Sequence, residues 1–188
     1  MSPASAGLRS PRALGGGGAG RGLDWSAIDL VVFDVDGTLY DQARLRRAML
    51  AQLARASLRS RSLDVVNALR HFRRVREWLA DQPGDDFATR QYALAAARCG
   101  LTAGEVEALA REWMERRPLP LLAACRYPHL DRLFEGLRRA GKRVAVFSDF
   151  PAADKLRALG LAAGTVVCSA DPDVRRLKPD PAGLHAIL

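Results

Sequence analysis

The chain has 188 residues, which suits one domain or a core domain carrying a small inserted one. Its 48% hydrophobic and 27% charged residues are typical of a globular protein. The chain contains no apolar run of about 18 residues, so no transmembrane helix is predicted. The formal net charge is +8, but all except three of the 29 basic residues are arginine and no aromatic residues alternate with them, so the charge indicates compositional bias and argues against a nucleic-acid-binding module.

Residues 1–23 carry a Gly15–Gly18 block, several arginines and no acid. This composition predicts a disordered leader, and a transit peptide is the alternative. The three cysteines, Cys99, Cys125 and Cys168, have no metal-binding spacing. We therefore expect reduced thiols and a cytoplasmic location.

The first predicted strand is Leu30–Phe33, a short, continuous run rich in β-branched residues. Such a run is typical of a strand buried on both faces in a parallel sheet. It leads directly into Asp34-Val35-Asp36-Gly37-Thr38.

Residues 41–122 differ in kind, because their apolar residues recur at helical spacing. They predict an all-helical block of four helices, the last of which begins at a Thr102–Glu105 capping box and ends before Pro118. The helices are expected around 45–56, 65–79, 87–99 and 102–116, and Gly100 is expected to end the third.

Strands and helices alternate again after the helical block. The expected elements are a helix at 130–140, a strand at 144–147, a helix at 152–159, a strand at 165–169 and a helix from about 182, inside which the chain ends. The helix at 130–140 is expected to have Leu133, Phe134 and Leu137 on one face. This order predicts an α/β fold with a doubly wound parallel sheet. Residues 24–40 and 123–188 would form its core, with 41–122 as an inserted all-helical cap domain.

Chemically active side chains follow each of the three predicted strands. Asp34 and Asp36 follow the first, Ser148 ends the second, and Lys178 comes after the third. Because active sites of open α/β sheets lie at the carboxyl ends of the strands, we expect these side chains to converge. Each alone is more often a turn residue, a cap or a solvated lysine, but all three in order favour a site.

The residue types suit phosphoryl transfer. A carboxylate fixed at the end of a strand, as Asp34 would be, can attack phosphorus, and Asp36 is near enough to exchange protons with the leaving group. Lys178 would supply a cation and Ser148 a hydroxyl donor, and Mg²⁺ would complete the neutralisation of charge.

The segment from Val31 to Leu39 resembles the first motif of the haloacid dehalogenase superfamily. Residues 144–148 resemble its second motif and 178–181 its third, and the helical block lies where that family carries a C1-type cap. The resemblance implies that Asp34 is the nucleophile and a magnesium ligand, and that Asp36 is the general acid/base and a second magnesium ligand through its backbone carbonyl. It also implies that Thr38, Ser148 and Lys178 bind phosphate.

The acid at position 36 distinguishes between activities within the superfamily, since its dehalogenases carry other residues there. We therefore expect a Mg²⁺-dependent phosphatase acting on a small organic phosphate, with a phosphomutase as the weaker alternative. The family's fourth motif, whose acids bind magnesium, is absent from residues 1–188. This absence predicts a C-terminally truncated, poorly soluble and nearly inactive fragment, and leaves open an inactive binding or scaffold protein.

Four arginines, Arg70, Arg73, Arg74 and Arg76, cluster in one predicted helix around His71. They could recruit anionic substrates, but a solvated helix face is the favoured interpretation. The expected partner is a small phosphorylated metabolite, with no nucleic acid and no membrane. The sequence does not specify the ester or the oligomeric state.

Overall fold

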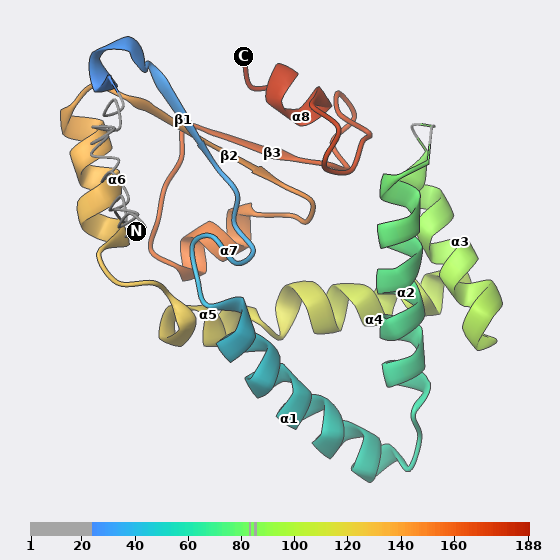
Figure 1. The fold of residues 1–188 in the computed structure, drawn as a ribbon. Coiled ribbons are helices and arrows are strands. Elements are labelled where there is room, and N and C mark those ends of the chain that lie inside the picture. Colours follow the sequence, from blue (N-terminus) through green and yellow to red (C-terminus); the bar gives the residue numbers. More distant parts are fainter. Residues whose placement is uncertain (1–23, 83, 85) are drawn as a thin grey trace, which may run out of the picture.

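The computed structural model describes residues 24–82, 84 and 86–188, so the leader predicted for residues 1–23 lies outside the described residues. The elements occur in the expected order of strand, helical block, and alternating helices and strands (Figure 1). They are η1 (Trp25–Ala27), β1 (Leu30–Phe33), α1 (Gln42–Ser60), α2 (Asp64–Ala80), α3 (Phe87–Cys99), α4 (Ala103–Ala110), η2 (Arg111–Arg116), α5 (Leu119–Cys125), α6 (Leu130–Arg139), β2 (Arg143–Ser148), α7 (Ala153–Ala158), β3 (Thr165–Cys168) and α8 (Ala182–His185).

The three strands form one parallel sheet in the order β1-β2-β3. Val32 pairs with Ala145, and Val146 pairs with Val166. The predicted α/β fold with a parallel sheet and inserted helices is thus confirmed. The burial expected for β1 was wrong, because all four of its residues are only half-buried. Within the described sheet β1 is an edge strand, so one side of it lacks a neighbour.

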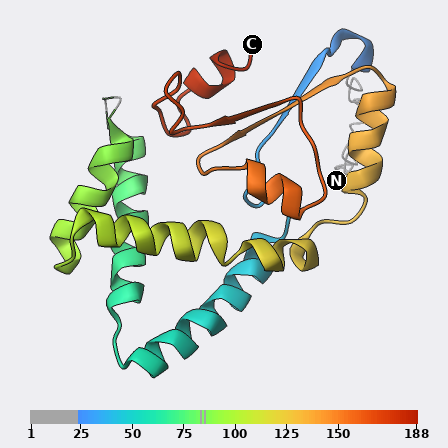
Figure 2. The same ribbon diagram turned by 180° about the vertical axis from the view of Figure 1, so that it is seen from behind.

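Successive side chains of β2 point to opposite faces of the sheet and enter two separate cores. Val146 is fully buried in a cluster with residues of α5, α6 and α7, whereas Phe147 packs on the other face near α8. Figures 1 and 2 show α8 on one side of the sheet and α7 with α5 on the other. Helix α8 approaches so closely that a Cβ at Gly183 would lie 2.1 Å from the Phe147 ring.

The stretch predicted to be helical contains α1 to α4. Helix α3 has the predicted limits, because Gly100 adopts the left-handed conformation that ends it. The predicted capping box is present at the start of α4, where Thr102 and Glu105 bond to each other's backbone. Helix α4 then passes into the π-helical segment η2. Phe72 of α2 stacks on Tyr92 of α3 with ring centroids 5.5 Å apart, within a separate apolar cluster.

Helix α5 was not predicted. Pro118 was taken as the end of the preceding helix, but it is the N-cap of a new one, and Pro120 lies in the first turn of that helix. Proline lacks a backbone N–H, and its φ is fixed near the helical value. It therefore suits a helix start as well as a helix end. The end of α5 then meets the beginning of the insertion, where Asp41 N donates to Cys125 O at 2.8 Å and Tyr40 forms a bridge with Arg126.

Two smaller expectations also need correction. Leu133 was placed with Phe134 and Leu137 on one face of α6, yet it is 43% exposed, whereas Leu137 is buried. Leu130 takes its place, because positions i, i+4 and i+7 share one helix face. Helix α8 ends at His185, so the chain does not end inside it. No helix in the part of the chain that the structure describes is long and apolar enough to cross a membrane.

Candidate functional site

A tight turn follows β1 and fixes the first candidate acids. The backbone N–H groups of Thr38 and Leu39 both donate to Val35 O, at 3.2 and 3.0 Å. Gly37 has φ +95, a conformation that favours glycine. Val35 and Leu39 are fully buried, so they anchor the turn in the core and leave Asp34 at the end of the strand.

Asp34 is held by a cation and a hydroxyl. Lys178 Nζ lies 2.6 Å from its Oδ1, and Thr38 Oγ1 donates to its Oδ2 at 3.0 Å. Lys178 Nζ also donates to Phe147 O at 2.8 Å, which fixes the ammonium group at the end of β2. The Asp34 side chain is 40% exposed, so a reactant can reach it. Three of the predicted site residues therefore lie together.

Asp36 is engaged more deeply. Lys155 Nζ donates to both of its carboxylate oxygens, at 2.6 and 2.7 Å, and the Tyr40 hydroxyl donates to Oδ1. The side chains of Lys155 and Asp36 are only 6% and 19% exposed. Burial and the neighbouring Asp36 charge raise the pKa of Tyr40. The phenol therefore stays protonated and acts as a donor.

Sequence reasoning missed Lys155 and Tyr40. Lys155 lies on α7 beside Leu156 and one turn from Ala152 and Leu159, all of which are buried. A lysine at an inward position of a short amphipathic helix is unusual unless its charge is paired, and this was the available signal.

Ser148 is fully buried at the end of β2, and its Oγ accepts from Phe150 N at 3.3 Å. Among the described residues it has no hydrogen bond to Asp34, Thr38 or Lys178, so its phosphate contact stays a prediction. The next residue, Asp149, does organise the site. Its Oδ1 accepts from Ser169 Oγ at 2.6 Å and from Lys178 N at 3.0 Å, and thereby positions the backbone of the lysine.

Arg76 connects the helical block to this loop. It is 9% exposed, and its guanidinium donates to Asp149 O at 2.7 Å and to Gln91 Oε1 at 2.5 Å. The same group lies 4.2 Å from the centre of the Phe150 ring. The sequence placed Arg76 with three arginines on a solvated face, and the structure corrects this: Arg76 is a buried contact between α2 and the core.

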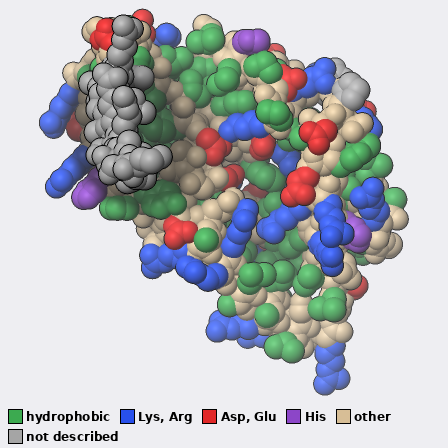
Figure 3. Space-filling model, viewed as in Figure 1, with side chains coloured by type: hydrophobic (Ala, Val, Ile, Leu, Met, Phe, Trp, Pro, Cys, Tyr) green, Lys and Arg blue, Asp and Glu red, His purple; other side chains and the backbone are tan. Residues whose placement is uncertain are grey.

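A pocket of about 760 Å³ lies between the core and the helical block. Its lining includes Asp36, Lys155 and Lys178 from the core and residues of α1, α2 and η2 from the block. Figure 3 shows lysine and arginine side chains gathered along the face where these two parts meet, with acidic side chains among them. A reactant in this pocket would be next to Asp36 and Lys178.

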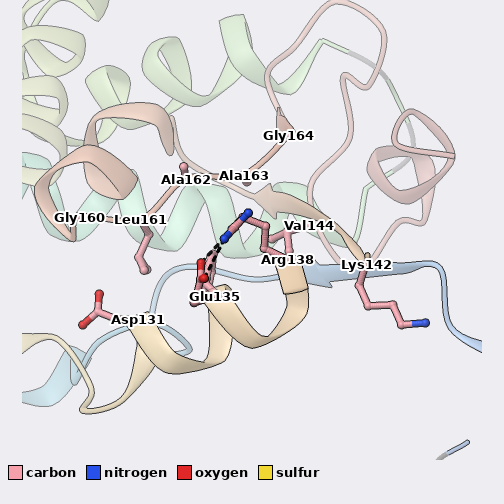
Figure 4. Close-up of a pocket in the computed structure, with 11 residues that line it drawn as sticks. Asp131, Glu135, Arg138, Lys142, Val144, Gly160, Leu161, Ala162, Ala163 and Gly164 are labelled. Atoms are coloured by element: carbon pink, nitrogen blue, oxygen red, sulfur yellow. Dashed lines mark hydrogen bonds and ion pairs between the residues drawn. The ribbon is translucent and has the colours of Figure 1, made fainter. Parts of the chain in front are cut away.

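A second hollow, of about 610 Å³, lies between α6 and residues 160–164 (Figure 4). Its charged side chains include Glu135 and Arg138, which are bonded to each other. Lys142 extends away from it. Because this hollow contains none of the candidate residues, we assign the chemistry to the larger pocket.

The donors near Asp34 suit magnesium when a phosphate is also present. Magnesium is usually bound by one or two carboxylates together with phosphate and water oxygens. Here the partly exposed Asp34 carboxylate and the Asp36 backbone carbonyl are the protein oxygens that could bind magnesium. The described residues contain no cluster of three or more His, Cys, Asp or Glu side chains that could hold a metal without further ligands.

Comparisons with known proteins agree with this architecture. A family model described as haloacid dehalogenase-like hydrolase matches residues 28–188. A solved 2-haloacid dehalogenase from Pseudomonas syringae pv. Tomato DC3000 is 26% identical, covers 86% of this chain and 71% of its own, and superposes with a TM-score of 0.55. An L-2-haloacid dehalogenase and another dehalogenase are 22% and 21% identical over 85% of this chain and 70% of theirs, with TM-scores of 0.42 and 0.44. No curated protein matches.

Proposed function

Because the chain belongs to the haloacid dehalogenase-like hydrolases, we propose that it is a magnesium-dependent phosphomonoester hydrolase. Its substrate would be a small organic phosphate, and Asp34 would be the nucleophile. The hydrolase family follows from the match, while the phosphatase activity, the metal and the roles of individual residues are our proposal.

The acid at position 36 carries this proposal. An alkoxide leaving group needs a proton as the ester bond breaks, whereas a halide ion leaves without one. An acid two residues after the nucleophile is therefore useful to a phosphatase and has no such role in dehalogenation. The two donors on Asp36, Lys155 and Tyr40, support a fixed position for that carboxylate.

The reaction would have two steps. In the first, an Asp34 oxygen bonds to phosphorus while the ester P–O bond breaks, and the leaving oxygen takes a proton from Asp36. In the second, water attacks phosphorus and gives a proton to Asp36, the bond to Asp34 breaks, and inorganic phosphate leaves. The ion pair with Lys155 fixes the position of the Asp36 side chain, which gives up the proton in the first step and regains it in the second.

The remaining residues would balance charge. Lys178, 2.6 Å from Asp34, would neutralise part of the charge on the phosphoryl oxygens, and Thr38 and Ser148 would donate hydrogen bonds to them. Asp34 and the Asp36 carbonyl would hold magnesium. When bound, the ion would neutralise charge on the transferring phosphoryl group.

Hydrolysis of 2-haloacids is the second candidate, because the solved structure that superposes with a TM-score of 0.55 is a 2-haloacid dehalogenase. In that reaction the carboxylate of Asp34 would displace halide from carbon, and water would then hydrolyse the ester formed. The two candidates predict different products from different substrates.

The deciding experiment offers the chain 4-nitrophenyl phosphate or 2-chloropropionate, with magnesium and with chelator. We expect nitrophenol and inorganic phosphate to be released only with magnesium, and Asp34→Asn to abolish release. Chloride release from 2-chloropropionate, independent of magnesium, would replace the phosphatase by a dehalogenase. Phosphate transfer to a second alcohol, without free phosphate, would indicate a mutase. Folded protein that turns over neither compound would refute both hydrolases and favour a binding protein.

A further inference from the structure

Arginines without acidic partners line the pocket beside the candidate acids. Arg46 comes from α1, and Arg70, Arg73 and Arg74 come from α2. None of them forms an ion pair with any residue that the structure describes, although other arginines of the same chain do, such as Arg111 with Glu107. Unpaired guanidinium groups facing one cavity form a region that attracts anions.

Two of these arginines repel each other electrostatically. Arg73 is exposed overall, but partial desolvation lowers its pKa and the nearby Arg46 charge lowers that pKa further, while Glu77 opposes the effect. The Arg46 charge also opposes the rise in the pKa of Tyr40, whose hydroxyl donates to Asp36. The pair therefore lies within electrostatic reach of the reaction site, and an anion between the two guanidiniums would relieve their repulsion.

Helix α2 places Arg73 away from the residues that would bind the phosphoryl group. Arg76 touches the core at Asp149, and Arg73 is three residues nearer the start of the helix. At about 1.5 Å per residue, Arg73 lies about 4.5 Å further along the axis from the core contact. Apolar side chains, among them Met49 and Leu69, also line the pocket. The lining thus combines an apolar surface with a cationic one.

We propose that the site selects phosphate esters whose alcohol part carries a second anionic group, which Arg46 and Arg73 bind. This inference rests on the proposed phosphatase function and specifies its substrate class. Guanidinium groups suit the role, because their planar array of donors matches the two oxygens of a carboxylate or phosphate. The apolar side chains would contact the body of the alcohol.

Two matched esters test the inference. 4-Carboxyphenyl phosphate carries a second anion, and 4-(methoxycarbonyl)phenyl phosphate has nearly the same shape without that charge. The measured quantity is the ratio of their kcat/KM values. We expect the ratio to favour the carboxylate and to fall about tenfold in Arg73→Gln and in Arg46→Gln, the loss typical of one charged hydrogen bond.

Arg47→Gln is the matched control. Arg47 is adjacent to Arg46 on α1 and is exposed, and it does not line the pocket. The control removes the same charge and should leave the ratio unchanged. An unchanged ratio in Arg73→Gln and Arg46→Gln would overturn the inference, as would an equal fall in Arg47→Gln, which would mean only a general effect of net charge.

A binding measurement separates this inference from the proposed function. Calorimetric titration of both esters into the Asp34→Asn variant requires no turnover. Tighter binding of the carboxylated ester that disappears when Arg73→Gln is added would support the anion site even if the chain hydrolyses no phosphate. Equal binding of the two esters would refute the anion site even if the chain is an active phosphatase.

Discussion

Removing the Lys155 ammonium should destabilise the protein mainly by leaving the half-buried Asp36 side chain without its cation. At 2.6 Å and an effective dielectric constant of about 20, the attraction within the pair is about 6 kcal/mol, which largely offsets the cost of dehydrating two ions. Breaking such a pair from one side costs about 3–5 kcal/mol. The hydroxyl of Tyr40 remains as a donor, so we expect Lys155→Met to cost about 3 kcal/mol, near the lower limit of that range.

The assay is urea unfolding of four proteins: wild type, Lys155→Met, Asp36→Asn and the double variant. The double variant has neither charge, and its Asn side chain can still accept from Tyr40. It should therefore be more stable than Lys155→Met, with a coupling free energy of about 2 kcal/mol or more. Lys142→Met is the control for loss of a lysine outside the site, expected within about 0.5 kcal/mol of wild type. If the losses in unfolding free energy of the two single variants add up to that of the double variant, the reasoning is refuted.

Three further outcomes follow from packing and burial. Gly183→Ala should cost about 1–3 kcal/mol in thermal or urea unfolding, because its Cβ would meet the Phe147 ring, and Phe147→Leu should reduce that cost. Burial raises the pKa of Glu115 above 4.5, so the stability from its neutral form is complete below pH 4.5 and is lost as the pH rises through the folded-state pKa. Glu115→Gln should therefore be more stable than wild type at pH 7, and equal stabilities at pH 7 would contradict this. Burial also raises the pKa of Cys168, so a thiol reagent should label the half-buried Cys99 first, as peptide mapping would reveal.

Local patterns in the sequence were enough for the fold. The β-branched run at Leu30–Phe33 marked the first strand, and Gly100 marked the end of α3 to the residue. Pro118 misled because proline both ends and begins helices, and only the packing of α5 on its neighbours selects the second role. The half-burial of β1 depends on the order of strands, which its own residues do not encode.

The site was predictable only where strands deliver residues to one edge. Asp34, Thr38 and Lys178 meet as expected, because the parallel sheet brings its carboxyl ends together. The partnership of Lys155 with Asp36 spans 119 positions and leaves no motif. Arg76 could not be told from its neighbouring arginines, since its burial depends on which face of α2 meets the core.

The bridge between Tyr40 and Arg126 has a consequence for how the fold could be altered. The chain leaves the core and returns to it at one paired position, so everything between is a loop whose ends are already joined. The entropy of closing such a loop grows only with the logarithm of its length, by about 0.6 kcal/mol for each doubling. Insertions of quite different size could thus be exchanged at this junction while the strands that carry the acids keep their path. Changes in substrate preference can then accumulate in one segment of the chain, while another segment retains the reaction chemistry.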